Sequence, residues 1–341
     1  MTYLTNTWYV AAWSDEVGTE FFTRTLLDIP VLFFRQDNRI VALQDMCPHR
    51  FAPLSLGTIV EGRVRCGYHG LEFDTEGNCV GSCLGQPAPR AARVRAFPTF
   101  EQDHAIWIWM GNPALADPGI IPRFPHHDDT SKMCNFGLTT AEADYRLLSD
   151  NLMDLTHTAM LHPDFGGLDY APKFKCWAEG NEIISSYVIE DMPSFIEPGS
   201  GKTVRHEDEI RWYAPGMHIL NSTTRVDDSG DEASTIFIPS GHLLTPETRT
   251  STHYFWSSAY DASMPFTKDE MRGALIQAFD HEDKPMVEAV QGRMAGREIW
   301  EMNPILLPSD AGGVRMRRKL DELIAAEQDS LVTGRTDRVN A

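Results

Sequence analysis

The sequence predicts an α+β protein of two domains, an N-terminal all-β domain and a C-terminal domain that combines strands with helices. The first observation is length, because 341 residues exceed what one ordinary domain needs. The second is a series of short β-rich runs, broken by turns, from Trp8 to about Trp109. The third is strong helical periodicity that begins only later, at Asp144. Hydrophobic residues make up 42% of the chain, which is ample for a core in each domain.

The first domain is predicted from runs of apolar and β-branched residues that are separated by turn residues. Strands are expected at residues 7–13, 24–29, 31–36, 39–45 and 104–110. Asp74, Glu76 and Gly77 mark a hairpin. Residues 111–125 contain four prolines, which is typical of a linker. We therefore expect domains at residues 1–118 and 119–341.

The second domain is expected to begin and end with helices and to hold strands between them. The first helix should run from Asp144 to Leu161, because leucines recur at helical spacing within it. Strands follow at residues 182–190, 234–244 and 252–260. The last long helix should begin at the Thr267 cap, continue past Pro285 and end near Met294. The polar tail after about Glu327 is expected to be frayed.

Charge and composition exclude several classes of partner. The chain has 30 Lys plus Arg against 49 Asp plus Glu, a formal charge of -19, which argues against nucleic acid or an anionic membrane. It has neither a basic leader at its N-terminus nor eighteen consecutive apolar residues. Its six cysteines show no disulfide framework. We expect a cytoplasmic protein.

Two Cys/His pairs near the start of the chain are the most informative motif: Cys47 with His49, and Cys66 with His69. Two thiolates for one iron and two imidazoles for the other are the ligands of a Rieske 2Fe-2S cluster, in which His raises the reduction potential. Tetrahedral zinc is the alternative, but zinc fingers pair Cys with Cys and His with His, whereas each arm here carries one of each. The sequence therefore predicts a Rieske cluster and a protein that transfers electrons.

The other cysteines narrow the type of Rieske protein. Rieske proteins of respiratory complexes carry an additional Cys beside each arm, which forms a disulfide, but the matching positions here are Ala52 and Tyr68. The low-potential, soluble branch is therefore the better match. Cys79 and Cys83 are close enough for a metal clip, although no second pair accompanies them, so buried or loop thiols are favoured.

A second metal site is predicted on the first helix of the C-terminal domain. Asn151, Asp154 and His157 fall three residues apart, and His162 follows at the helix end. The two histidines are five residues apart, about 140° around a regular helix, so the helix must end or bulge between them to bring them together. Asp283 is the candidate third ligand, and two His with one carboxylate form the facial triad of non-haem Fe(II) oxygenases. Each residue alone would more often be an ordinary structural residue.

Asp283 is selected because it interrupts an apolar helix face, where an unpaired carboxylate is costly. That face is formed by Leu275, Ile276, Phe279, Met286, Val287 and Val290. Pro285 lies in the same helix and should kink it, because proline cannot donate a backbone hydrogen bond. The kink is expected to open the helix beside Asp283.

Several segments resemble the oxygenase component of Rieske non-haem iron monooxygenases, in the group of vanillate O-demethylase, dicamba O-demethylase and toluenesulfonate methyl-monooxygenase. They are NTWYVAAW, CPHRFAPLS, CGYHGLEFD, DYRLLSDNLMDLTHTAMLHP, HLLTPET, HYFW and EDK, and the resemblance covers nearly the whole chain. It implies a Rieske β-domain followed by a helix-grip domain, an antiparallel sheet with helices around mononuclear Fe(II). Asp154 would then bridge the two centres, with Asn151 close to the iron. His242 and Asn221 resemble substrate-binding residues of the dicamba enzyme.

The resemblance also implies a homotrimer in which electrons cross between subunits, from His69 of one copy through Asp154 of the next to His157. Electrons would come from a separate NADH-dependent flavoprotein reductase with its own plant-type 2Fe-2S domain. No GxGxxG fingerprint occurs, so the chain itself is not expected to bind NADH or flavin. The Gly199 to Thr203 segment, GSGKT, lacks the first glycine of a phosphate-binding loop and is expected to be a surface turn.

The expected activity is O2-dependent O-demethylation of a small methoxylated aromatic acid, such as a vanillate-like compound. Hydroxylation of an aryl methyl group, as on toluenesulfonate, is the alternative, because the iron chemistry is common to both. Ala274 stands where the dicamba enzyme has a pocket Trp, which disfavours dicamba itself. A Rieske electron carrier would need no facial triad, and a non-catalytic binding module would need no cluster.

Overall fold

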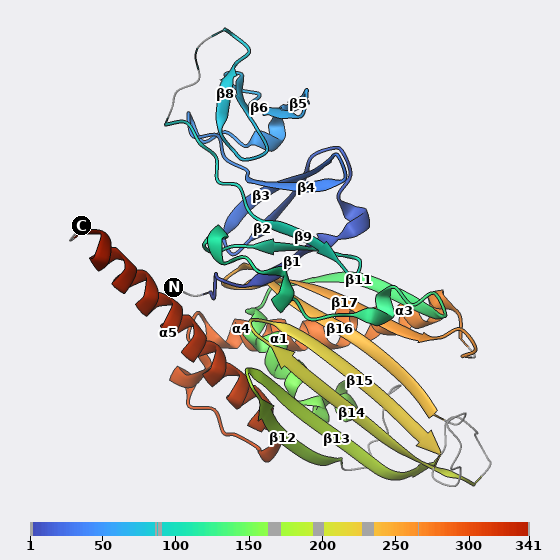
Figure 1. Ribbon diagram of the computed structural model, residues 1–341. Helices are drawn as coiled ribbons and strands as arrows, with labels where there is room; N and C mark the ends of the chain where they lie inside the picture. Colours follow the sequence, from blue (N-terminus) through green and yellow to red (C-terminus); the bar gives the residue numbers. More distant parts are fainter. Residues whose placement is uncertain are drawn as a thin grey trace. The chain divides into compact units, whose positions relative to one another are not determined.

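The computed structural model describes residues 3–339 except 86, 88–90, 163–171, 194–200, 227–234 and 265, with side chains up to residue 330. The chain forms two compact units (Figure 1). The N-terminal unit comprises Thr5–Arg123 and Thr245–Arg249. The C-terminal unit comprises Phe124–Leu244 and residues from Thr250 onward, together with the residues up to Leu4. The boundary near residue 118 stays a prediction for separately folding domains.

The N-terminal unit is built from three small antiparallel sheets around aromatic and branched side chains. The first sheet has the order β1 (Trp8–Trp13), β10 (Ala105–Trp109), β9 (Thr99–Gln102). The second is β2 (Phe22–Leu26), β3 (Ile29–Gln36), β4 (Arg39–Gln44), and the third is β5 (Thr58–Val60), β6 (Arg63–Arg65), β7 (Leu71–Phe73), β8 (Cys79–Ser82). The all-β prediction for this region is confirmed.

One predicted strand is shifted. The run at 24–29 contains the turn between β2 and β3, where Leu27 and Asp28 have φ of 52° and 64°. Two consecutive residues with positive φ are typical of the tight hairpin turn that matches the twist of its strands. The apolar character of Leu27 concealed this turn from pattern reasoning.

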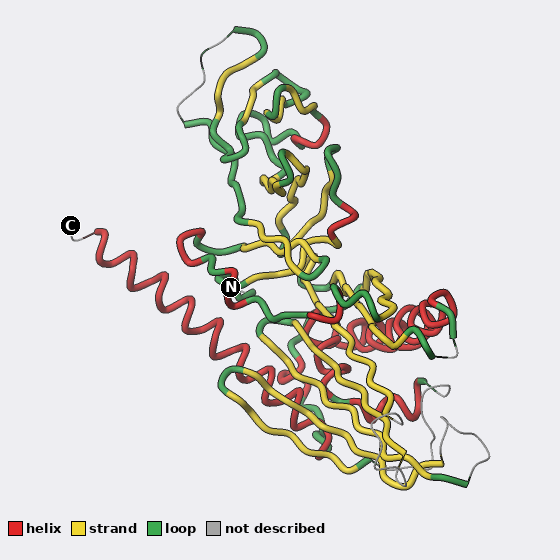
Figure 2. Tube along the Cα trace, turned by 45° about the vertical axis from the view of Figure 1, so that its right-hand side comes forward, coloured by secondary structure: helices red, strands yellow, loops and turns green. Residues whose placement is uncertain are grey.

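The C-terminal unit is a seven-stranded sheet with helices packed against it (Figures 1 and 2). The strand order is β11 (Lys132–Ala141), β17 (Ser251–Asp261), β16 (Thr235–Thr248), β15 (Met217–Val226), β14 (Thr203–Tyr213), β13 (Glu182–Pro193), β12 (Lys173–Glu179). The pairs from β12 through β16 and the pair β11–β17 are antiparallel. The α+β prediction is therefore confirmed, with the helices packed against the sheet.

The helices come from three parts of the C-terminal unit. They are α1 (Tyr145–Met153), α2 (Thr158–Leu161), α3 (Lys268–Ile276), α4 (Lys284–Met294) and α5 (Ala311–Val339), with a π-helical segment at Gln277–Asp283 between α3 and α4. Short 3-10 turns lie at Ser14–Glu16, Leu54–Leu56, Pro113–Leu115, Pro118–Ile120, Pro125–His127, Leu155–His157, Ile299–Met302 and Pro308–Asp310. Among the described residues, no helix combines the length and apolarity that crossing a membrane requires.

Hydrogen bonds attach α1 to its surroundings. The Tyr187 hydroxyl on β13 donates to the carbonyl oxygen of Met153 at 2.7 Å. Arg317 of α5 binds both carboxylate oxygens of Asp150, with Nη2 at 2.6 Å and Nε at 2.9 Å. Asp144 caps the start of α1 by accepting from the Arg146 amide. These contacts hold α1 between the sheet and α5.

Two helix predictions need correction. The helix expected from Asp144 to Leu161 ends at Met153, because Asp154 leaves helical geometry and caps a new 3-10 turn with its own carboxylate. The tail expected to be frayed after Glu327 continues as helix α5 to Val339. The long C-terminal segment was missed because it is polar on most of its surface, although Met316 and Leu320 are fully buried.

Candidate metal centres

The two Cys/His pairs lie on adjacent loops of the N-terminal unit. Cys47 and Cys66 are buried, at 1% and 3% exposure, within the core around β3, β4 and β7. His49 and His69 are exposed, and their rings meet edge to face with centroids 4.6 Å apart. Each loop is closed by an amide that bonds back to its cysteine carbonyl: Phe51 to Cys47 at 2.8 Å, and Gly70 to Cys66 at 3.0 Å.

This arrangement fits a 2Fe-2S cluster. The structure brings two buried thiols and two neighbouring imidazoles together, which is the Rieske donor set. Burial raises the pKa of the Cys47 thiol, and the neighbouring Cys66 raises it further. Metals bind cysteine as the thiolate, so an iron cluster here would take the place of the protons on these two neighbouring thiols. Gly67 is required sterically, because an added Cβ would lie 2.5 Å from the Leu56 carbonyl oxygen.

The second predicted centre is also assembled in the structure. Possible ligand atoms of His157, His162 and Asp283 all lie within 4.8 Å of one another. Nε2 of His157 lies 3.5 Å from Oδ1 of Asp283, and Nε2 of His162 lies 3.3 Å from the same oxygen. Their side chains are 19%, 7% and 7% exposed, respectively. Two imidazole nitrogens that converge on one buried carboxylate fit Fe(II) with open coordination positions.

The opposite ring nitrogens fix the orientation of both imidazoles. Nδ1 of His157 donates to the backbone carbonyl of Asp154 at 2.6 Å, and Nδ1 of His162 lies 2.7 Å from Oε2 of Glu282. Nε2 is therefore left for a metal in both rings. Burial lowers the pKa of His157 despite the opposing charge of Asp283. Burial also opposes charge on His162, but its bonds to Asp283 and Glu282 outweigh burial and raise its pKa.

The first helix is interrupted at Asp154, before both histidines. Asp154 has φ −124° and ψ 93°, and its Oδ1 accepts from the Thr156 amide at 3.0 Å and the Thr156 hydroxyl at 2.6 Å. The chain then resumes as a 3-10 turn that ends at His157 and continues into α2. The helix also ends between the two histidines, as expected, because α2 stops at Leu161 and His162 has φ −116° and ψ 69°. The break at Asp154 is an additional one that the sequence analysis did not predict.

The Asp283 side of the site is formed by a π-helical segment at Gln277–Asp283. Such segments are often found at functional sites, because one extra residue in a turn redirects the side chains that follow. Pro285 follows the segment within one continuous helical stretch from Lys268 to Met294, so its missing N–H leaves a gap in the backbone hydrogen bonds two residues after Asp283. The Asn151 amide donates to Oδ1 of Asp283 at 3.2 Å, so Asn151 contacts the predicted ligand directly.

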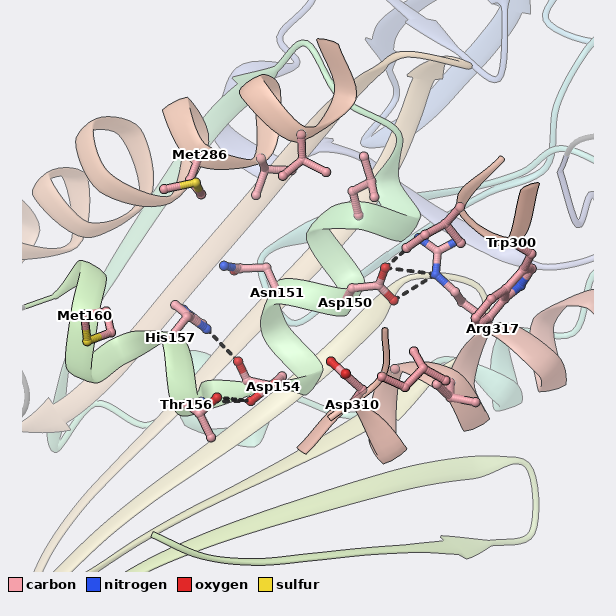
Figure 3. Close-up of a pocket in the computed structure, with 17 residues that line it drawn as sticks. Asp150, Asn151, Asp154, Thr156, His157, Met160, Met286, Trp300, Asp310 and Arg317 are labelled. Carbon is pink, nitrogen blue, oxygen red and sulfur yellow. Dashed lines mark hydrogen bonds and ion pairs between the residues drawn. The ribbon is translucent and has the colours of Figure 1, made fainter. Parts of the chain in front are cut away.

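Part of the apolar helix face from which Asp283 was predicted as a ligand is exposed rather than buried in the core. Val287 is 5% exposed, but Met286 and Val290 are 49% and 42% exposed. Met286 and Val290 line a groove of about 490 Å³ beside α1 (Figure 3). Asp154 and His157 line the same groove. Met160, Trp300 and Leu306 contribute further exposed apolar surface.

The two proposed substrate contacts are separated by the sheet register. His242 faces His218 across β15 and β16, whereas Asn221 faces Pro239. Because side chains alternate along a strand, His242 and Asn221 point to opposite faces of the sheet. His242 shares its face with Ser240, whose hydroxyl lies 3.2 Å from Nε2. The structure thus does not bring the two together, and a role in substrate binding stays a prediction for each.

His242 lies in a buried aromatic layer beside the π-helical segment. Its Nδ1 is 2.6 Å from the Tyr254 hydroxyl, and its ring meets Phe279 edge to face at 5.6 Å. Trp256 packs on the same Phe279 ring at 5.5 Å. Burial lowers the pKa of His242 to about 4, so the ring is neutral at pH 7 and can serve as a hydrogen-bonding group rather than a cation.

Sequence reasoning missed Glu282 as a contact of His162. The residue is next to Asp283, but the regular-helix periodicity that selected Asp283 assigns its neighbour to another face. Only the π-helical turn, for which Pro285 was an indirect signal, brings both carboxylates to the same imidazole.

Comparison with known families agrees with these two centres. Residues 7–98 match the Rieske [2Fe-2S] domain, and residues 141–326 match the vanillate O-demethylase oxygenase C-terminal domain. The chain is 37% identical over 338 residues to the dicamba O-demethylase oxygenase component of Stenotrophomonas maltophilia, covering 95% of this chain and 98% of the relative. It is 34% identical to the chloroacetanilide N-alkylformylase oxygenase component of Rhizorhabdus wittichii, covering 95% and 97%.

A vanillate O-demethylase oxygenase subunit of Pseudomonas is 35% identical, covering 87% of this chain and 94% of that subunit. Among solved structures, dicamba monooxygenase bound to dicamba superimposes with a TM-score of 0.84 at 35% identity, covering 96% of this chain and 100% of the other. Dicamba monooxygenase with non-haem iron and dicamba gives a TM-score of 0.82, with 96% and 99% covered.

Proposed function

Because the chain belongs to the vanillate O-demethylase family of Rieske non-haem iron oxygenase components, we propose that it O-demethylates a small methoxylated aromatic acid. Proteins of this family use a Rieske 2Fe-2S cluster and a mononuclear iron. We assign the cluster to Cys47, His49, Cys66 and His69. The mononuclear iron is assigned to His157, His162 and Asp283.

The observation that carries the proposal is the convergence of two Nε2 atoms on Oδ1 of Asp283. Iron held there supplies a site for activation of dioxygen, and the cluster supplies an electron. The protein contributes orientation, since both Nδ1 atoms are already hydrogen-bonded and Asn151 donates to Asp283. His242, Tyr254 and Trp256 pack on the ring of Phe279, which precedes Asp283 by four residues, and form an aromatic layer behind this part of the helix.

The reaction balances with one dioxygen, two electrons and two protons. One oxygen atom enters the methoxy C–H bond, the resulting hemiacetal collapses to a phenol and formaldehyde, and the other oxygen atom leaves as water. Hydroxylation of an aryl methyl group has the same balance but gives a benzylic alcohol. That alternative stays open, since a toluene-4-sulfonate monooxygenase subunit is 33% identical to this chain over 350 residues.

The electrons come from a separate protein, because family members are oxygenase components of multicomponent systems. We propose that this protein is an NADH-dependent reductase with flavin and 2Fe-2S groups. A cytoplasmic location is part of the same proposal and is supported by the four cysteines outside the cluster, none of which forms a disulfide.

We further propose a homotrimer in which the cluster loops of one copy contact the groove of the next. Phe51, Leu56 and Tyr68 are 70%, 77% and 65% exposed on the cluster loops, and apolar groups of this size favour a covered surface. The groove offers the exposed side chains of Met160 and Trp300 as a matching apolar surface. Such a contact would bring His69 of one copy to Asp154 of the other.

Co-expression of two inactive variants tests this contact. His69→Ala removes a cluster ligand, and Asp154→Asn removes the acceptor carboxylate in the groove. If electrons cross between subunits, mixed trimers should recover turnover at interfaces that combine an intact His69 with an intact Asp154. Mixed trimers as inactive as the two parents would contradict the proposed contact.

The catalytic proposal is tested by formaldehyde yield per NADH consumed, with purified protein, a surrogate reductase and a panel of methoxy- and methyl-substituted aryl acids. We expect one formaldehyde per NADH on a methoxy substrate. A benzylic alcohol without formaldehyde would move the protein to the methyl-hydroxylating branch. NADH oxidation with no organic product on any compound would contradict the proposal.

A further inference from the structure

The two imidazoles of the candidate iron site have chemically different partners on their outer nitrogens. Nδ1 of His157 faces a neutral acceptor, the backbone carbonyl of Asp154, at 2.6 Å. Nδ1 of His162 faces a carboxylate, Oε2 of Glu282, at 2.7 Å. A carboxylate partner polarises an imidazole more strongly than a carbonyl does, because the bond is charge-assisted.

The second oxygen of Glu282 is also bound. The Gln277 side-chain amide donates to Oε1 of Glu282 at 3.1 Å. The two residues are five positions apart, and one turn of a π-helix joins positions five apart. The π-helical segment therefore stacks Gln277 directly over Glu282, which an α-helical turn would not do.

The same segment lets two consecutive carboxylates contact one ring. Oε2 of Glu282 lies at Nδ1 of His162, and Oδ1 of Asp283 lies 3.3 Å from its Nε2. His162 is buried and Glu282 is partly buried, with side chains 7% and 17% exposed. The carboxylate–imidazole bond at 2.7 Å is short and directed at Nδ1, so it can hold the ring in one orientation.

We infer that Glu282 is a positioning residue for His162, and that Gln277 holds Glu282 in place across the π-helical turn. The inference rests on the proposed function, in which His162 is a metal ligand. Glu282 fixes the tautomer that leaves Nε2 free for the metal and raises the basicity of that nitrogen. His162 is therefore the stronger and His157 the weaker of the two imidazole donors.

The test is a titration of Co(II) into full-length protein that has an intact cluster and has been depleted of mononuclear iron. Outer partners of metal-binding histidines typically contribute about 10- to 100-fold in metal affinity, so Glu282→Gln should weaken Co(II) binding by about that factor. Its Co(II) absorption bands should shift as well, because the donor strength of His162 changes. Gln277→Leu should cause a smaller loss in the same direction.

Two further variants make the result specific. Glu282→Asp keeps the charge and should recover part of the affinity that the amide loses. Glu288→Gln on α4 is the matched control, since Glu288 accepts from the Glu142 amide at 2.8 Å and does not contact the site. Affinity and spectrum of Glu282→Gln that equal those of wild type and Glu288→Gln would overturn the inference.

Wild-type protein and Asp283→Ala separate this inference from the proposed function. If wild-type protein binds Co(II) and Asp283→Ala does not, the metal site holds, and the result for Glu282→Gln decides the inference alone. If Asp283→Ala binds Co(II) as wild type does, the metal site itself is wrong, and with it both the proposed function and the inference.

Discussion

Replacing Gly137 by alanine should displace the aromatic layer that supports the iron site. Gly137 on β11 is paired with Trp256 on β17, and an added Cβ would lie only 2.0 Å from Cζ2 of that indole. Ordinary van der Waals contact begins at 3.4 Å, so Trp256 would have to move by at least about 1.4 Å. Trp256 is 1% exposed, and close packing of protein interiors opposes such a movement.

The displacement should reach the π-helical segment by two routes. The Trp256 ring packs on Phe279 at 5.5 Å between centroids. Its indole N–H also donates to Thr139 at 3.1 Å, and the Thr139 hydroxyl donates to Asp280. Overpacking of this kind costs about 1–3 kcal/mol. We expect thermal unfolding to shift down by roughly 2–12 °C and Co(II) affinity at the mononuclear site to fall.

Gly273→Ala is the control. Gly273 is an exposed position of α3, and an added Cβ there would meet nothing within 4 Å. Alanine should stabilise the helix by roughly 0.5–1 kcal/mol and leave metal binding unchanged. If Gly137→Ala unfolds at the wild-type temperature and binds Co(II) normally, the aromatic layer does not support the site.

Three further predictions address the site and its surroundings. Asp154→Asn keeps the backbone carbonyl of residue 154 that accepts from His157, so iron analysis should find both metal centres filled. Turnover should nevertheless be nearly abolished, and full activity would refute the bridging role of Asp154. Asp283→Ala should lower iron from three atoms per chain towards two, and an unchanged content would reject Asp283 as a ligand. Burial opposes charge on His206, but the neighbouring Asp208 outweighs burial and raises the pKa of His206. The ion pair between them therefore stabilises the fold fully below the pKa of an unfolded histidine, near 6.5. That stabilisation is lost as the pH rises through the higher pKa of the folded protein. Asp208→Asn should therefore lower the urea midpoint more at pH 6 than at pH 9, and equal losses would contradict that sign.

Sequence patterns were sufficient to predict features that depend on particular residue types at short spacing along the chain. The Cys/His pairs define a donor set by themselves. The Thr267 cap was also readable, since Thr267 and Glu270 form a capping box that starts α3 as expected.

Patterns failed where tertiary context decides the geometry. The leucine periodicity continues past Met153, so only the competing hydrogen bonds of the Asp154 side chain reveal the break before His157. An apolar stripe does not distinguish core from surface, which is why Met286 and Val290 were read as buried. The first is a local competition between side-chain and helical hydrogen bonds, and the second is a matter of burial that the tertiary packing decides.

The register of β15 and β16 is the clearest such case. The separation of Asn221 from His242 along the chain does not reveal which face each one occupies, because a shift of one residue in pairing reverses every side chain. Only the pairing of His218 with His242 determines this.

A single-turnover experiment without any reductase tests the central claim most directly. The protein is reduced chemically, freed of excess reductant and exposed to dioxygen with a methoxylated aryl acid, and formaldehyde is measured per mononuclear iron. The account predicts one formaldehyde for each iron in wild-type protein and none in Asp283→Ala. Cluster oxidation in wild-type protein without formaldehyde on any methoxy substrate would show that this chain transfers electrons but does not demethylate.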